Sequence, residues 1–132
     1  MQIGDTHVIH STVTADTTAA HIGSGGLPVY GTPYMAALME NAAYTMLQRE
    51  LPEGKTSVGT MLSVFHVSAS PVGIAVHAAA EITDISPDGR SVGFKVFAYD
   101  DAGQIGEGTH RRAIVDAERF LAKCEGKLKK ED

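Results

Sequence analysis

The longest helical pattern of apolar residues in the chain lies between residues 32 and 51. Its apolar positions recur three or four residues apart, so they share one face of an α-helix. They are Met35, Met39, Ala42, Ala43, Met46 and Leu47. Thr32 followed by Pro33 is typical of a helix start with the threonine as N-cap, and Pro52 predicts the end near Leu51. Because this helix is too apolar to lie on an open surface, we expect a sheet to wrap around it and bury it.

Segments of alternating apolar and polar residues, typical of strands, precede and follow this helix. The predicted strands are 6–13, 57–68, 73–85, 91–100 and 104–115. Short turns rich in Gly, Pro and Asp join the last four, which predicts an antiparallel sheet. In the second strand, the alternation places Val58, Leu62, Val64 and His66 on one face, the expected core face. The order predicts an α+β fold in a single domain, 1–132, with 116–132 as a charged terminal helix or tail.

Composition narrows the class of protein. The chain has 132 residues, 43% of them hydrophobic and 20% charged, which indicates one globular domain. We see neither an apolar stretch of about 20 residues nor a secretory signal, and we expect a cytoplasmic protein without membrane contact. Cys124 is the only cysteine, so no internal disulfide or cysteine-based metal site is expected, and we predict neither metal nor cofactor. A net charge of −5 argues against nucleic-acid binding.

Four polar residues stand out as candidates for chemistry. Glu40 lies at the border of the apolar helical arc, where it either faces a cleft or extends to solvent. His66, on the expected core face, is either satisfied by the backbone or functional. Thr32 is either only a cap or also a source of a hydroxyl group. A hydroxyl, a carboxylate and an imidazole together form a plausible acyl-transfer set. His110, beside a run of basic residues, is a candidate to line a ligand site.

Five segments together carry a family resemblance. They are 31–42 (GTPYMAALMENA), 57–60 (SVGT), His66, 70–73 (SPVG) and 106–112 (GEGTHRR). In this combination the chain resembles the hotdog-fold thioesterases of the fluoroacetyl-CoA thioesterase type, from the first strand to the start of the terminal helix. The resemblance implies a hotdog fold, in which an antiparallel sheet wraps a central helix. It also implies hydrolysis of an acyl-CoA thioester by a homodimer with active sites at the subunit interface, while pairing of dimers into tetramers stays open.

The resemblance also implies roles for individual residues. Thr32, Glu40 and His66 match the catalytic threonine, glutamate and histidine of the family. Gly59 and Arg112 match positions that line the acyl pocket. Glu40 would act either as a general base on water or as a nucleophile. The Gly59 backbone N–H is a candidate donor to the oxyanion.

One segment departs from the family pattern. The fluoroacetyl-specific enzyme has a phenylalanine-rich lid before its catalytic threonine, whereas residues 21–30 contain no phenylalanine and three glycines. We therefore expect a short or medium acyl-CoA as substrate. A non-catalytic acyl-CoA-binding module is the alternative function, although a pure binder has no need of both Glu40 and His66. A hotdog hydratase ranks last, because its usual Asp–His motif is not seen.

The uneven distribution of basic residues indicates a candidate phosphate contact if the ligand is coenzyme A. Residues 111–132 hold 7 of the 11 basic side chains. They are Arg111, Arg112, Arg119, Lys123, Lys127, Lys129 and Lys130. Either they form an edge that attracts the phosphates of coenzyme A, or the lysines belong to a solvated helix face.

Overall fold

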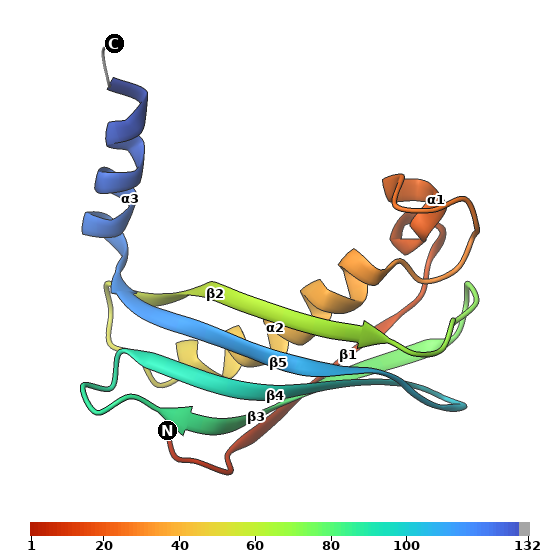
Figure 1. Ribbon diagram of the computed structural model, residues 1–132, viewed down its shortest axis with the longest axis horizontal. Helices are drawn as coiled ribbons and strands as arrows, with labels where there is room; N and C mark the ends of the chain where they lie inside the picture. Colours follow the sequence, from red (N-terminus) through yellow and green to blue (C-terminus); the bar gives the residue numbers. More distant parts are fainter. Residues whose placement is uncertain (130–132) are drawn as a thin grey trace.

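The apolar helix is the central element of the computed structural model, which describes residues 1–129. Helix α2 (Thr32–Gln48) packs against one face of the sheet (Figure 1), and its six predicted apolar side chains are at most 3% exposed. The N-cap is Gly31 and not Thr32, because the Thr32 hydroxyl is engaged elsewhere. The helix ends at Gln48, short of Leu51, and the Gln48 side-chain amide is hydrogen-bonded to the start of the next strand.

Five antiparallel strands form the sheet, in the order β1-β3-β4-β5-β2. The strands are β1 (Thr6–Thr12), β2 (Lys55–His66), β3 (Ala75–Ile85), β4 (Ser91–Asp100) and β5 (Gly103–Asp116). The remaining elements are η1 (Ala15–Thr17), α1 (Ala19–Ile22), α3 (Ala117–Glu125) and η2 (Gly126–Lys129). Side chains on the inner faces of β3 and β4 form the core with α2. The α+β hotdog fold is therefore confirmed.

A β-bulge in β2 changes which of its side chains face the helix. The register to β5 shifts between Gly59 and Met61, so Thr60 is an extra residue. Beyond the bulge, Leu62, Val64 and His66 share the inner face as predicted. Before the bulge the parity is reversed, because one inserted residue moves every preceding side chain to the other face. Ser57 and Gly59 thus face inward in place of Val58, which corrects the predicted face.

Strand β2 lies at the edge of the sheet, with one side free of neighbouring strands. Helices α1 and α3 both stand out beyond this edge, at opposite ends of β2 (Figure 1). The predicted terminal helix is confirmed over α3, while 130–132, including the candidate Lys130, lie outside the described residues. No helix in the described part of the chain is long and apolar enough to cross a membrane.

Candidate active site

Thr32 and His66 lie together at the N-terminal end of α2. Thr32 Oγ1 and His66 Nδ1 are 2.7 Å apart, which joins the first residue of the helix to the last residue of β2. This hydrogen bond explains why the threonine does not cap the helix. The pair lines a hollow of about 280 Å³ together with Tyr30, Val29 and residues 66–69. Two of the three predicted catalytic side chains therefore meet within one chain.

The other ring nitrogen of His66 is available for chemistry. Its Nε2 atom is buried and has no hydrogen-bond partner among the described residues. Burial lowers the pKa of His66 below 6.5, since a charged imidazolium is poorly solvated there. In the neutral ring one nitrogen carries the proton, and the direction of the hydrogen bond between Nδ1 and the Thr32 hydroxyl depends on which nitrogen that is. The rings of Tyr30 and His66 pack in a T-shaped arrangement, with an interplanar angle of 87° and ring centroids 6.5 Å apart.

Glu40 lies elsewhere, beside Gly59 and Arg112. A Cβ placed on Gly59 would be 2.8 Å from Glu40 Oε2, so the carboxylate lies against the bare backbone of the bulged strand. The same Cβ would be 3.5 Å from Arg112 Nη1. These residues, with Tyr44, line an open hollow of about 350 Å³. Glu40 is half-buried, at the border of the apolar arc as predicted.

Arg112 is a buried cation with fixed geometry. It is 7% exposed, and its Nε and Nη2 donate to the hydroxyl and carbonyl oxygens of Ser57 at 2.8 and 3.0 Å. Tyr44 lies under the guanidinium, 5.6 Å from its carbon to the ring centroid. Burial lowers the pKa of Arg112, and the negative charge of Glu40 partly offsets this. The result is a positive charge held beside the Glu40 carboxylate.

His110 supports Arg112 and does not line the hollow. It is 1% exposed, and its Nδ1 donates to the Met61 carbonyl at 2.8 Å. Its Nε2 then accepts from Arg112 Nη1 at 3.2 Å. Burial first, and the charge of Arg112 second, lower the pKa of His110 and keep it neutral. Among the described residues His110 contacts Arg112, which lines the hollow, and a ligand contact of His110 stays a prediction.

The two groups occupy separate hollows of one chain. Thr32 and Glu40 are eight residues apart on α2, about 12 Å along the helix axis. His66 and Gly59 are about 20 Å apart along β2. No residue lines both hollows. A single chain therefore presents the imidazole–hydroxyl pair in one place and the carboxylate in another.

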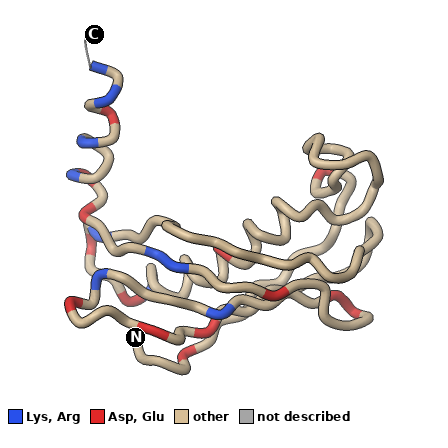
Figure 2. Tube along the Cα trace, viewed as in Figure 1, with Lys and Arg blue, Asp and Glu red and all other residues tan. Residues whose placement is uncertain are grey.

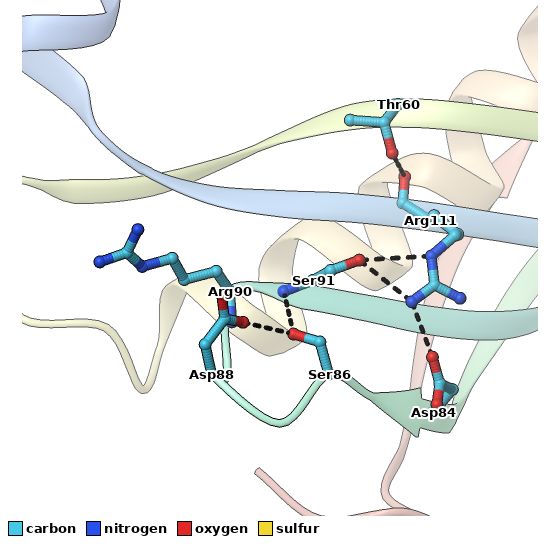
Figure 3. A network of polar contacts seen from close by, with 7 residues as sticks. All are labelled: Thr60, Asp84, Ser86, Asp88, Arg90, Ser91 and Arg111. Atoms are coloured by element: carbon cyan, nitrogen blue, oxygen red, sulfur yellow. Dashed lines mark hydrogen bonds and ion pairs between the residues drawn. The ribbon is translucent and has the colours of Figure 1, made fainter.

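The basic residues of the C-terminal region also lie in different places and do not form one surface. Arg111, predicted as a phosphate contact, pairs with Asp84 at 2.7 Å and also donates to Ser91 (Figure 3). Since adjacent strand residues point to opposite faces, Arg111 lies on the outer face and Arg112 on the inner one. Neither lies on α3, which carries Arg119 and Lys123, or on η2, which carries Lys127 and Lys129. The expected basic edge is accordingly smaller than the sequence indicated.

Sequence patterns alone did not single out Ser57 and Tyr44. Ser57 faces inward only because of the bulge at Thr60, which no residue pattern in a single strand reveals. Tyr44 follows Glu40 by four residues and thus shares its helix face. That spacing was visible, but its partner Arg112 comes from a strand far away in the sequence.

Comparisons with known proteins show which family and which fold the chain resembles. The family model described as fluoroacetyl-CoA-specific thioesterase matches residues 13–118. A curated fluoroacetyl-CoA thioesterase from Streptantibioticus cattleyicolor is 37% identical over 99 residues, which cover 75% of this chain and 70% of that protein. A solved structure of a fluoroacetyl-CoA thioesterase is 32% identical with a TM-score of 0.89, covering 96% of this chain and 97% of the other. A thioesterase superfamily member from Thermus thermophilus is 25% identical with a TM-score of 0.87, over 98% and 97% of the two chains.

Proposed function

This chain belongs to the fluoroacetyl-CoA-specific thioesterase family, and we propose that it hydrolyses a short or medium acyl-CoA to the free acid and coenzyme A. The observation that carries the assignment of residues is the 2.7 Å hydrogen bond between Thr32 and His66 in an open hollow. A non-catalytic binding module would not need a neutral imidazole whose second nitrogen is free. Family membership and this pair both favour hydrolysis over binding alone.

The chemistry requires a base, a proton carrier and a site for negative charge. Glu40 removes a proton from water while the water oxygen bonds to the thioester carbonyl carbon, and the carbonyl electrons move to oxygen. The Gly59 N–H and the Thr32 hydroxyl are the proposed donors to that oxyanion, the latter at the positive end of α2. When the C–S bond breaks, the proton passes through His66 to the departing sulfur. The products are a carboxylic acid and the thiol of coenzyme A.

A homodimer would bring the separate groups together. Strand β2 is an edge strand with exposed Met61 and Phe65, features that favour pairing with a second strand. Antiparallel pairing of two β2 strands about a two-fold axis near residues 62–63 sets Gly59 of one protomer opposite His66 of its partner. Glu40 of one protomer then faces Thr32 and His66 of the other. The dimer would thus hold two equivalent sites.

The range of acyl groups that the site accepts is proposed from the segment that borders the Thr32 hollow. Residues 21–30 contain three glycines and no phenylalanine, so we propose that the site accepts short and medium acyl groups without selecting fluoroacetyl. A panel of acyl-CoA thioesters of increasing length, including fluoroacetyl-CoA, tests this. A preference of kcat/KM for fluoroacetyl over acetyl by several orders of magnitude would contradict it. A cytoplasmic location belongs to the same proposal, supported by the exposed free thiol of Cys124.

Subunit complementation tests the shared site. Glu40→Gln and His66→Ala homodimers should each lose most activity on the best acyl-CoA. Equal mixing with subunit exchange should restore about a quarter of wild-type activity, because half the dimers are mixed and each has one intact site. Thr32→Ala mixed with His66→Ala is the matched control and should restore nothing, since these residues lie in one hollow of one chain. Full activity of both single variants would refute the catalytic roles.

A further inference from the structure

A third hollow, of about 300 Å³, lies between α3 and the end of the sheet from which α3 rises. Four cationic side chains from three separate parts of the chain line it. Lys55 is the first residue of β2, Arg90 precedes β4, and Arg119 and Lys123 are one turn apart on α3. Figure 2 shows Lys and Arg gathered along α3 and at this end of the sheet.

The side chains that line this hollow carry more positive than negative charge, with four cations against one carboxylate. None of the four side chains forms an ion pair with any residue of 1–129. Asp116 is the one acidic residue in the lining, and its carboxylate accepts the Arg119 backbone N–H at 2.9 Å as the N-cap of α3. Four like charges around one concave surface repel one another, and a multiply charged anion would offset that repulsion.

The hollow also has an apolar surface and a fixed relation to the candidate active site. Phe120, 46% exposed, lines it and presents a ring on which a planar base can stack. Lys55 precedes Gly59 by four residues on β2, and Asp116 follows Arg112 by four on β5. Both separations are about 13 Å along the strands. A ligand with its reacting group at Gly59 and Arg112 therefore needs an extended arm to reach the cations.

We propose that this hollow binds the phosphorylated adenosine end of coenzyme A, with the pantetheine arm running along β2 and β5 to the thioester. The inference rests on the proposed function, since it takes acyl-CoA as the substrate. The nucleotide carries several phosphate charges together with one planar base, which match the four cations and Phe120. The arm of an acyl carrier protein carries one phosphodiester and no base, and so matches the hollow less well.

Paired substitutions test the site from both of its sides. Arg119→Gln/Lys123→Gln and Lys55→Gln/Arg90→Gln should each raise the KM for acyl-CoA about tenfold, the loss of roughly one charged contact, with kcat unchanged. The same acyl group on N-acetylcysteamine, which lacks the nucleotide, should keep its kinetic constants. Arg49→Gln/Lys95→Gln makes the same change of charge outside the hollow and should leave both substrates unaffected. The wild-type KM for acyl-CoA should rise with salt, and less so in the hollow variants.

Three results would overturn the proposal. These are an unchanged KM for acyl-CoA in both paired variants, an equal rise for both thioesters, or a loss confined to acyl carrier protein substrates. If the wild-type protein hydrolysed neither thioester, the proposed function would fail separately. Calorimetric titration with free coenzyme A would then decide the site alone: about tenfold weaker binding in the paired variants supports it, and equal binding refutes it.

Discussion

Adding a single methyl group at Gly59 should lower activity while leaving the stability of the fold nearly unchanged. A Cβ there would be 2.8 Å from Glu40 Oε2 and 3.3 Å from His110 Cε1. Carbon and oxygen atoms in close contact stay about 3.3 Å apart or more, so one neighbour must move by about 0.5 Å. His110 is held by the Met61 carbonyl and by Arg112, whereas the Glu40 carboxylate borders an open hollow. Gly59→Ala should therefore displace the carboxylate.

Gly59→Ala should lower kcat/KM much more than it changes the free energy of unfolding. Displacement of a catalytic group by this order of distance costs about 100-fold in kcat/KM. Alanine gains about 0.5–1 kcal/mol over glycine in a strand interior, so the free energy of unfolding should change by less than about 1 kcal/mol. Coenzyme A release measures the first quantity and urea denaturation the second. Gly126→Ala, with open space around its Cβ, is the matched control and should alter neither.

A double-variant cycle identifies the path of the effect. If Gly59→Ala acts through Glu40, it should cost little further activity in the Glu40→Gln background, because the proposed base is already absent. A 100-fold loss in both backgrounds would mean that Gly59 acts independently, for example through its own N–H. Wild-type kcat/KM in a correctly folded Gly59→Ala protein would refute the steric reasoning altogether.

Three further predictions concern stability. Burial lowers the pKa of His66 and His110, so as the pH falls the unfolded chain binds protons at these residues before the folded chain does. The free energy of unfolding should therefore fall as the pH drops below about 6.5. Urea titrations at pH 8 and 5.5 measure it, and a higher value at pH 5.5 would contradict the prediction. Met39→Ala should cost about 2–5 kcal/mol, because Met39 is fully buried between α2 and the sheet; a change under 1 kcal/mol in the same assay would place it outside the core. Arg111→Gln should cost at most about 1 kcal/mol and leave kcat/KM unchanged, because its ion pair with Asp84 is largely solvated; a large loss of activity would show that the outer face contributes to the site.

The sequence predicted the helix and the strands well, because burial imposes a period that the residues must follow. All six apolar positions of α2, from Met35 to Leu47, are buried, and β4 has its predicted bounds. The errors occur where a local interaction competes with the pattern. Thr32 has the sequence of an N-cap, but its hydroxyl is bonded to His66, which is distant in the sequence. The bulge at Thr60 reverses the facing of Val58, and a single strand gives no signal of an inserted residue.

The separation of Glu40 from His66 in one chain is itself informative about assembly. Both sets of residues have their geometry fixed within one chain. Ser57 and His110 hold Arg112 beside the Glu40 carboxylate, and Thr32 is hydrogen-bonded to the His66 imidazole. Buried cations and unpartnered buried nitrogens are costly, and a fold retains them where they serve a ligand or a reaction. In the proposed mechanism neither group suffices for thioester hydrolysis, because one lacks the carboxylate and the other the proton carrier. The free edge of β2 runs between them, so one antiparallel pairing would complete two sites at once, and activity should depend on association of the subunits.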